Sequence, residues 1–221
     1  MFHKFTDRLS GLSKGDFTSL NLGDHVGDLS ADVSANRDIL VARYGPIQYM
    51  NQVHGDRIIC VEEVIPEAPI ADALVTGIPG ITLAVMVADC IPLLLTSREA
   101  VAAVHVGRRG LVNSVAKKTI EVMRSMGAYE ITAHIGPAIC GQCYEVPRQM
   151  HDEIVALHPR TTSQTNSGSH SLDLIAGLKE ILVKSDVADI TDVNICTYES
   201  KDYFSYRRSG VTGRQVGLVS L

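Results

Sequence analysis

Three apolar segments follow one another between residues 81 and 106, and no helical pattern separates them. They are 81–87, 91–96 and 101–106, with breaks at Asp89 and Pro92. Short runs of Val, Ile and Leu bounded in this way are typical of buried strands. Strands joined without a helix favour antiparallel pairing, since a parallel pair needs a long crossover. A uniformly alternating strand–helix chain is therefore excluded, and the predicted fold class is α+β, with mixed or antiparallel sheets flanked by helices.

The remaining segments predict further strands and two clear helices. The other strands are expected at 57–64, 130–135, 192–197 and 215–220. Helical periodicity is clear at 111–126 and 172–185, where Ser171 is the expected N-cap, and weaker at 149–157. The Ser- and Thr-rich stretch 159–171 is expected to be an exposed loop. With 221 residues and no internal repeat, the chain is predicted to form a single catalytic domain over 1–221.

Composition excludes several classes of partner. The net charge is −5 and the pI is near 5.9, which argues against nucleic acid, because phosphate neutralisation needs a basic surface. No stretch reaches the roughly 20 apolar residues that span a bilayer, so no membrane association is expected. The five cysteines are an odd number for a disulfide framework. They predict reduced thiols and a cytoplasmic location.

Two histidines and one cysteine stand at the ends of predicted strands. His54 comes just before a strand, Cys90 lies at the break between two very apolar strands, and His105 ends the strand that starts at Val101. Rigid backbone at such positions can hold side chains within the narrow tolerance that a metal ion demands. The three residues are therefore candidate metal ligands.

The chemistry of this ligand set favours zinc. Two imidazoles and one thiolate suit zinc, and three protein ligands leave a fourth position for water, whose pKa zinc lowers to about 7. The spacing matches no short zinc-finger pattern. The residues alone leave two alternatives open: a small buried cysteine with hydrogen-bonded surface histidines, or a Cys90 nucleophile that a histidine activates.

Several motifs add a family resemblance. They are Gln-Val-His-Gly at 52–55, Ala-Asp-Ala-Leu-Val-Thr at 71–76, Ala-Asp-Cys-Ile-Pro at 88–92, His-Val-Gly-Arg-Arg-Gly at 105–110, Cys-Tyr-Glu-Val at 143–146 and Phe-Ser-Tyr-Arg-Arg at 204–208. Together they resemble the purine nucleoside phosphorylase family formerly labelled multicopper polyphenol oxidase, or laccase. The likeness keeps the order of the motifs along nearly the whole chain. One departure is Arg108, where the family usually has Trp, which bears on the pocket wall and on substrate preference.

The resemblance implies a site and an activity. It implies zinc bound by His54, Cys90 and His105, phosphorolysis of adenosine, inosine and methylthioadenosine, and deamination of adenosine. Deamination needs a proton shuttle, for which Asp89 and Glu145 are the candidates beside Cys90. Phosphorolysis needs a phosphate clamp, a task that suits the fork of arginine. The expected substrate and phosphate ligands are Arg37 (the first choice), Asn21, Arg108 and Arg208, with Arg207 and Arg214 as further candidates.

Other functions use the same residues. A copper-dependent polyphenol oxidase fits the family's older label, but no two of the eight histidines form a His-x-His pair. A non-catalytic protein with a structural metal would need a fourth protein ligand, such as His134 or Cys143. The Cys140-x-x-Cys143 pair lacks the order of the zinc nucleobase deaminase motif, which excludes that family. In the family that the chain resembles, the cysteine before Tyr-Glu-Val is common but is not a metal ligand, so both cysteines are interpreted as structural.

Overall fold

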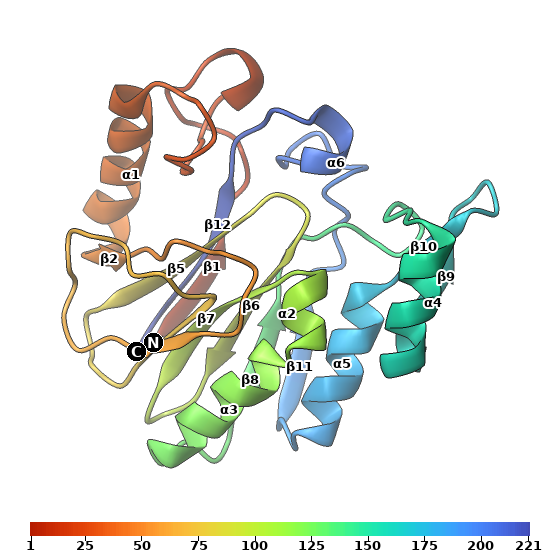
Figure 1. Ribbon diagram of the computed structural model, residues 1–221. Coiled ribbons are helices and arrows are strands. Elements are labelled where there is room, and N and C mark those ends of the chain that lie inside the picture. Colours follow the sequence, from red (N-terminus) through yellow and green to blue (C-terminus); the bar gives the residue numbers. More distant parts are fainter.

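Two β-sheets packed face to face form the centre of the protein in the computed structural model, which describes residues 1–221 (Figure 1). The larger sheet has six strands in the order β11-β8-β6-β7-β4-β3, and the smaller has four in the order β1-β12-β5-β2. Most neighbours are antiparallel, and the parallel pairs are β3 with β4, β11 with β8, and β2 with β5. The predicted α+β class is confirmed.

The strands are short and mostly buried. The larger sheet consists of β3 (Ile58–Cys60), β4 (Ala73–Thr76), β6 (Ile91–Thr96), β7 (Val101–Val106), β8 (Thr132–Ile135) and β11 (Asp189–Asp192). The smaller sheet consists of β1 (Phe2–Phe5), β2 (Ile47–Gln48), β5 (Thr82–Val87) and β12 (Gln215–Ser220). A separate hairpin pairs β9 (Thr162–Gln164) with β10 (His170–Leu172).

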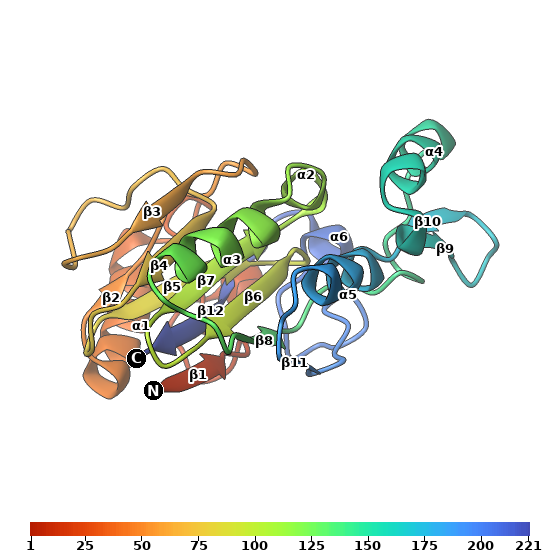
Figure 2. The ribbon, with the colours of Figure 1, turned by 90° about the horizontal axis from the view of Figure 1, so that it is seen from below.

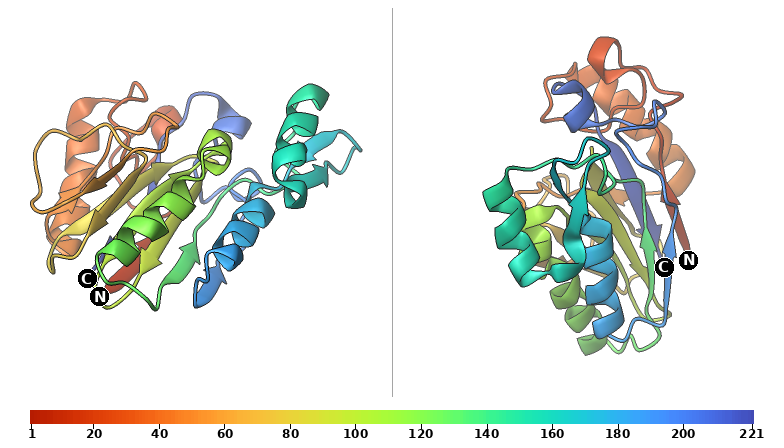
Figure 3. Two further views of the ribbon diagram at one scale, coloured as in Figure 1. Left: turned by 60° about the horizontal axis from the view of Figure 1, so that its bottom comes forward. Right: turned by 90° about the vertical axis from the view of Figure 1, so that its right-hand side faces the viewer.

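Helices cover the outer face of each sheet (Figures 2 and 3). They are α1 (Ser30–Tyr44), α2 (Arg108–Val112), α3 (Val115–Ser125), α4 (Arg148–Leu157), α5 (Leu174–Lys184) and α6 (Tyr206–Ser209), with 3-10 turns η1 (Gly15–Phe17) and η2 (Pro159–Thr161). The smaller sheet packs against α1, and the larger sheet packs against α2, α3 and α5. The protein therefore has four layers: helix, sheet, sheet, helices.

Strand periodicity assigns each side chain to one of these layers. In β7, Ala102, Val104 and Val106 face the helices, whereas Val101 and Ala103 face the smaller sheet. His105 shares the second face, because side chains alternate along a strand. At the end of β7 this places an imidazole between the two sheets.

Antiparallel pairing between consecutive strands was predicted for 81–106. It is confirmed for β6 with β7 but is wrong for β5, which pairs with neither of them. Strand β5 belongs to the smaller sheet, where it pairs with β12 and β2. The chain therefore crosses from one sheet to the other at Ala88–Cys90, and Asp89 adopts a left-handed φ of 89° in the crossing. The crossing places Cys90 at the end of the inter-sheet core.

Several boundaries differ from the sequence-based expectations. The strand expected at 192–197 is at Asp189–Asp192, and Cys196 makes only an isolated bridge with Ala138. The helix expected at 111–126 breaks at Ser114, whose φ is 59°. The stretch 159–171 carries η2 and the β9–β10 hairpin, and the N-cap of α5 is Asp173, whose side chain accepts from Ala176 N.

Helix α1 was not expected, because only Val33, Asn36 and Leu40 are buried along its 15 residues. One of these is polar, so the apolar stripe is too thin to stand out in the sequence. No helix of the protein has the length and apolar character needed to cross a membrane.

Candidate metal centre

The side chains of His54, Cys90 and His105 converge in one group. Cys90 lies between the end of β5 and the start of β6, and these strand ends lie away from the two chain termini in Figure 1. Their potential ligand atoms all lie within 4.8 Å of one another. The Sγ atom of Cys90 is 3.8 Å from Nε2 of His54. Two ligands on tetrahedral zinc, at about 2.3 Å for sulfur and 2.0–2.1 Å for nitrogen, would be about 3.6 Å apart. The three residues therefore fit one metal ion.

Strand register explains why these residues meet. In the ladder of β4 and β7, Asp72 lies opposite His105, one step beyond the pair Ala73–Val104, and His105 N donates to Asp72 O at 2.8 Å. In the ladder of β6 and β7, Pro92 lies opposite His105, which brings Cys90 opposite Gly107. The larger sheet thus aligns Cys90 and His105 before any metal is present.

Asp72 organises the third ligand. Its carboxylate accepts hydrogen bonds from the backbone N atoms of Val53, His54 and Gly55, at 3.3, 2.9 and 2.6 Å. This network holds the loop after Asn51 against the sheet, with His54 in a left-handed conformation at a φ of 59°. A fully buried carboxylate that gathers three N–H groups is a loop anchor.

Asp72 also orients His105. Its Oδ1 atom lies 2.8 Å from Nδ1 of His105, so the imidazole donates there and presents Nε2 to the ligand group. Carboxylate–histidine–metal chains of this kind fix the tautomer of a ligand and raise its basicity. The sequence reasoning assigned no role to Asp72. The available signal was its place in the motif at 71–76, one residue before a buried strand.

Cys90 and His105 change each other's pKa values. Burial alone would raise the pKa of the Cys90 thiol, but the charge and hydrogen bond of His105, aided by His54, lower it to about 6. Burial alone would lower the pKa of His105, but Cys90 and Asp72 raise it to about 9. The protein therefore stabilises a thiolate at neutral pH, and thiolate is the form of cysteine that binds metals.

Gly107 leaves the space in which the ligands sit. A Cβ atom at this position would be 3.0 Å from the Cys90 sulfur and 3.1 Å from Cδ2 of His54. Any larger residue at this position, which lies opposite Cys90 in the ladder, would displace the Cys90 or His54 side chain by a few tenths of an ångström.

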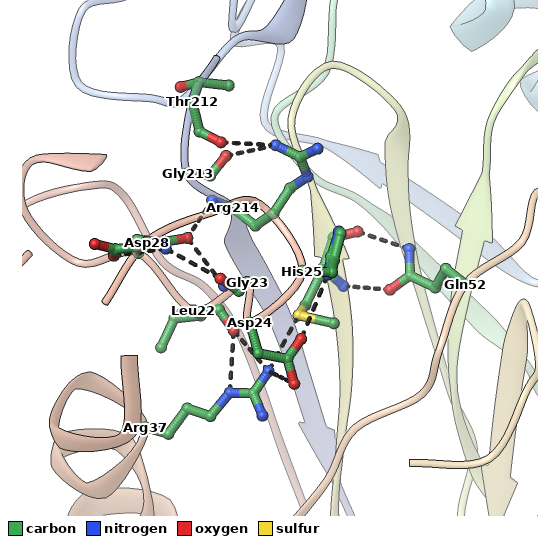
Figure 4. A network of polar contacts seen from close by, with 12 residues as sticks. Leu22, Gly23, Asp24, His25, Asp28, Arg37, Gln52, Thr212, Gly213 and Arg214 are labelled. Carbon is green, nitrogen blue, oxygen red and sulfur yellow. Dashed lines mark hydrogen bonds and ion pairs between the residues drawn. The ribbon is translucent and has the colours of Figure 1, made fainter. Parts of the chain in front are cut away.

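A cavity of about 420 Å³ opens directly onto the three ligands. Its other walls include Gln52, Met86, Asp89, Tyr144, Tyr206, His25 and the two arginines Arg207 and Arg214. Gln52 pairs its side-chain amide with the backbone of Met86, with bonds of 2.7 and 2.8 Å (Figure 4). The metal group therefore forms part of the lining of a polar pocket.

None of the four expected substrate and phosphate ligands, Asn21, Arg37, Arg108 and Arg208, lines this cavity, whereas the further candidates Arg207 and Arg214 do. Arg37 donates twice to Leu22 O and pairs with Asp24 at 3.2 Å (Figure 4). Its guanidinium also stacks over Tyr49. Arg208 donates to carbonyl oxygens of Thr197, Tyr198, Ser200 and Tyr203. Both guanidinium groups thus hold backbone segments together.

Asn21 and Arg214 meet at the cavity wall. Asn21 is buried, and its Oδ1 accepts from Arg214 N at 2.9 Å. Nη1 of Arg214 donates to Thr212 O and Gly213 O, whereas its Nε and Nη2 atoms have no protein partner. Figure 4 places Asp24 and His25 between Arg214 and Arg37.

Arg108 and Arg207 lie beside Tyr144. Burial raises the pKa of Tyr144 although Arg108 lowers it, and the guanidinium of Arg207 is 5.0 Å from the centre of its ring. Arg207 also donates to Glu145 O at 2.6 Å. Position 108, where the sequence departs from the usual Trp, therefore interacts with a tyrosine that lines the cavity.

The two candidate proton shuttles differ in position. Asp89 lines the cavity, and its carboxylate accepts from Thr197 Oγ1 at 2.7 Å and from Arg207 N at 2.6 Å. Glu145 is exposed and lies in a shallow depression next to Val146 and Pro147. Of the two, only Asp89 lines the cavity onto which the three candidate ligands open.

Comparison with known proteins gives consistent matches over the whole chain. A family model described as "Multi-copper polyphenol oxidoreductase laccase" matches residues 2–221. A purine nucleoside phosphorylase of Streptomyces griseus is 43% identical, over 98% of this chain and 93% of the relative. One of Corynebacterium glutamicum is 40% identical, over 98% and 93%.

Solved structures share the fold. A Neisseria meningitidis protein of family DUF152 superposes with a TM-score of 0.91 at 36% identity, over 99% of this chain and 93% of that chain. YlmD from Geobacillus stearothermophilus gives 0.88 at 29% identity, over 99% and 90%.

Proposed function

The chain belongs to the family described as multi-copper polyphenol oxidoreductase laccase, as its motifs indicated, and we propose that it is a zinc-dependent purine nucleoside phosphorylase with adenosine deaminase activity. The observation that carries the proposal is the cavity of about 420 Å³, which combines a three-residue metal group with two arginines and two tyrosines. Several relatives named purine nucleoside phosphorylase support it. Residues 1–221 act as one catalytic domain, and the five free thiols fit the reducing cytoplasm.

The cavity has the size and lining that a nucleoside needs. Small-molecule sites are typically about 300–1,000 Å³ and combine apolar and aromatic walls with a few polar groups. Tyr144 and Tyr206 offer aromatic faces to a purine, and Met86 and Val87 add apolar surface. Adenosine, inosine and methylthioadenosine are the proposed substrates.

Arg214 and Arg207 are the proposed phosphate ligands. Both line the cavity, and the Nε–Nη2 edge of Arg214 is free to meet two phosphate oxygens. Asn21 contributes by fixing the backbone of Arg214. Arg37 and Arg208 act through the backbone segments that they hold, and Arg108 contributes through Tyr144.

The three ligands suit a catalytic rather than a closed metal site. A zinc ion held by His54, Cys90 and His105 would supply Lewis-acid activation at the cavity floor. The residues around it have separate tasks. Asp72 keeps His105 in the ligating tautomer, and Asp89 is the proposed proton carrier for deamination, because it is the carboxylate that faces the cavity.

The family description favours a second candidate, a copper-dependent polyphenol oxidase. A His₂Cys set also binds copper in electron-transfer proteins. However, only His54 and His105 among the eight histidines belong to a group of potential metal ligands. We favour zinc because the ligand group opens onto a substrate-sized cavity.

Metal analysis and product analysis on the same protein test both candidates. Protein saturated with Zn²⁺ and then dialysed should release adenine or hypoxanthine from nucleosides only when inorganic phosphate is present. It should form inosine from adenosine without phosphate. Cys90→Ala should abolish both reactions.

The proposed phosphate ligand is tested separately. Arg214→Gln should raise the KM for phosphate more than tenfold and spare deamination, whereas the exposed Arg148→Gln serves as a matched control. Zinc-loaded protein that leaves all three nucleosides intact would refute the proposal, and phenol oxidation by the copper-loaded form alone would establish the second candidate.

A further inference from the structure

Three cysteines and a glutamate form a second cluster of potential metal ligands away from the cavity. The sulfur atoms of Cys140, Cys143 and Cys196 and a carboxylate oxygen of Glu199 all lie within 4.8 Å of one another. None of these residues lines the cavity. We propose that this cluster is a structural zinc site, distinct from His54, Cys90 and His105.

The ligand geometry agrees with a tetrahedral ion. Thiolates at about 2.3 Å from zinc lie about 3.8 Å apart at the edges of the tetrahedron. Cys143 Sγ and Glu199 Oε1 are already 3.4 Å apart. Four protein ligands leave no open position, which is the arrangement of structural rather than catalytic zinc.

Local backbone structure holds the four ligands in place. The N atoms of Cys143 and Tyr144 both donate to Cys140 O, at 3.1 and 3.0 Å, so the Cys-x-x-Cys segment closes into a tight turn. Cys140 N donates to the sulfur of Cys196 at 3.4 Å. An N–H directed at sulfur stabilises a thiolate ligand, as in other metal–cysteine sites.

The two ligand pairs come from loops that are far apart in the sequence. Cys140 and Cys143 lie between β8 and α4, whereas Cys196 and Glu199 lie between β11 and α6. Ala138 pairs with Cys196 in a parallel bridge, and Thr197 N donates to Ala138 O at 3.1 Å. A bound ion would join these loops more firmly than this single bridge does.

The cluster is neutral at its sulfur atoms until a cation binds. Burial raises the pKa values of the Cys140 and Cys143 thiols, and Cys143 Sγ donates to the Glu199 carboxylate. Zinc binds the thiolate form, so binding would displace these protons and offset the negative charge that appears on the sulfur atoms.

A disulfide would explain the cluster less completely. Two sulfur atoms suffice for a disulfide, and the third cysteine and Glu199 would then have no reason to converge. Cys-x-x-Cys pairs in reducing compartments bind metals or act in redox chemistry. The presence of four ligands rather than two favours the metal.

The proposed zinc site would stabilise the residues that hold Asp89 in the cavity wall. Thr197 follows Cys196, and its hydroxyl donates to Asp89 at 2.7 Å, one residue before Cys90. Ile139 N, next to Cys140, donates to Asp89 O at 3.0 Å. The proposed ion therefore holds both segments that position the crossing between β5 and β6.

Metal stoichiometry tests the proposal directly. Wild-type protein purified under reducing conditions and supplied with Zn²⁺ should retain two equivalents per chain after dialysis. Cys143→Ser and Glu199→Gln should lower retention to one, and Cys90→Ser should remove the other equivalent. Cys60→Ser is the matched control, because Cys60 is exposed and belongs to neither cluster, so it should retain two.

A second measurement tests the proposal even if the Cys143→Ser and Glu199→Gln variants do not fold. In the Cys90→Ser background, Co²⁺ should bind one equivalent and give the intense charge-transfer absorption of several thiolates. Zn²⁺ should protect Cys140, Cys143 and Cys196 from alkylation, and a chelator should expose them. Loss of all zinc from the Cys90→Ser variant, no thiolate absorption with Co²⁺ in that variant, or a Cys140–Cys143 disulfide in protein kept reduced would each overturn the proposal.

Discussion

The carboxylate of Asp72 lies opposite His105 in the ladder of β4 and β7 and accepts from its Nδ1 atom at 2.8 Å. The same carboxylate accepts from His54 N at 2.9 Å. One buried residue thus positions two of the three proposed metal ligands, one through its side chain and the other through its backbone. The proposed metal centre therefore depends on a residue outside the ligand group.

Asp72→Asn should weaken zinc binding about 10- to 100-fold, the usual effect of losing the hydrogen-bond partner of a ligating histidine. The neutral amide is a weaker acceptor for His105 and for the three N–H groups of the loop. Competition with a chromogenic chelator measures the affinity. Asp56→Asn, on the same loop but paired with Lys118, is the control. Equal affinities for the two variants would contradict the assigned role.

Alkylation of Cys90 in metal-free protein should follow a pKa of about 6 instead of the ordinary value of 9.0. Iodoacetamide reacts with the thiolate, so the rate should rise with pH up to about 7 and level off above it. His105→Ala should move the midpoint upward, because it removes the strongest charge that stabilises the thiolate. Mass spectrometry of the Cys90 peptide gives the rates. A wild-type midpoint near 9 would show that the histidines do not stabilise the Cys90 thiolate.

Gly107→Ala should abolish metal binding at the cavity without unfolding the protein. The new methyl group would be 3.0 Å from the Cys90 sulfur and 3.1 Å from the His54 ring, so at least one ligand must move. Gly110→Ala is a matched control, because its methyl group is equally crowded, at 3.1 Å from His105 O, but meets no ligand side chain. Zinc content and circular dichroism separate the two effects. The idea fails if both variants keep the metal equally well.

Arg208→Ala should destabilise the fold by about 3 kcal/mol. Charged hydrogen bonds contribute about 1.5–3 kcal/mol each, and four carbonyl oxygens lose their donor. Water would replace part of the lost hydrogen bonding. Arg148→Ala, which removes an exposed i,i+4 ion pair, should cost less than about 1 kcal/mol. Urea unfolding of both variants measures the difference. Similar free energies of unfolding would show that Arg208 has no structural role.

Local sequence pattern predicted the elements whose burial is strong and regular. Strands β6, β7 and β12 were expected at their observed bounds because each is a short, fully buried apolar run between turn residues. Helix α1 was missed because a thin buried stripe leaves little periodicity. The strand expected at 192–197 was misplaced, since β11 alternates only weakly between exposed and half-buried residues.

The sequence by itself determined which residues could bind a metal and in which order they occur. The reason is that the ability of His54, Cys90 and His105 to act as ligands depends on the chemistry of each side chain. Only the tertiary structure decided that Asp72 joins them, that Arg214 lines the cavity while Arg37 and Arg208 hold backbone, and that Glu199 completes a second cluster. The physical reason is sheet geometry. Strand register and the crossing between two sheets bring together side chains that are far apart in the sequence, such as Asp89 and Thr197, which are 108 positions apart, and no local pattern encodes such pairing.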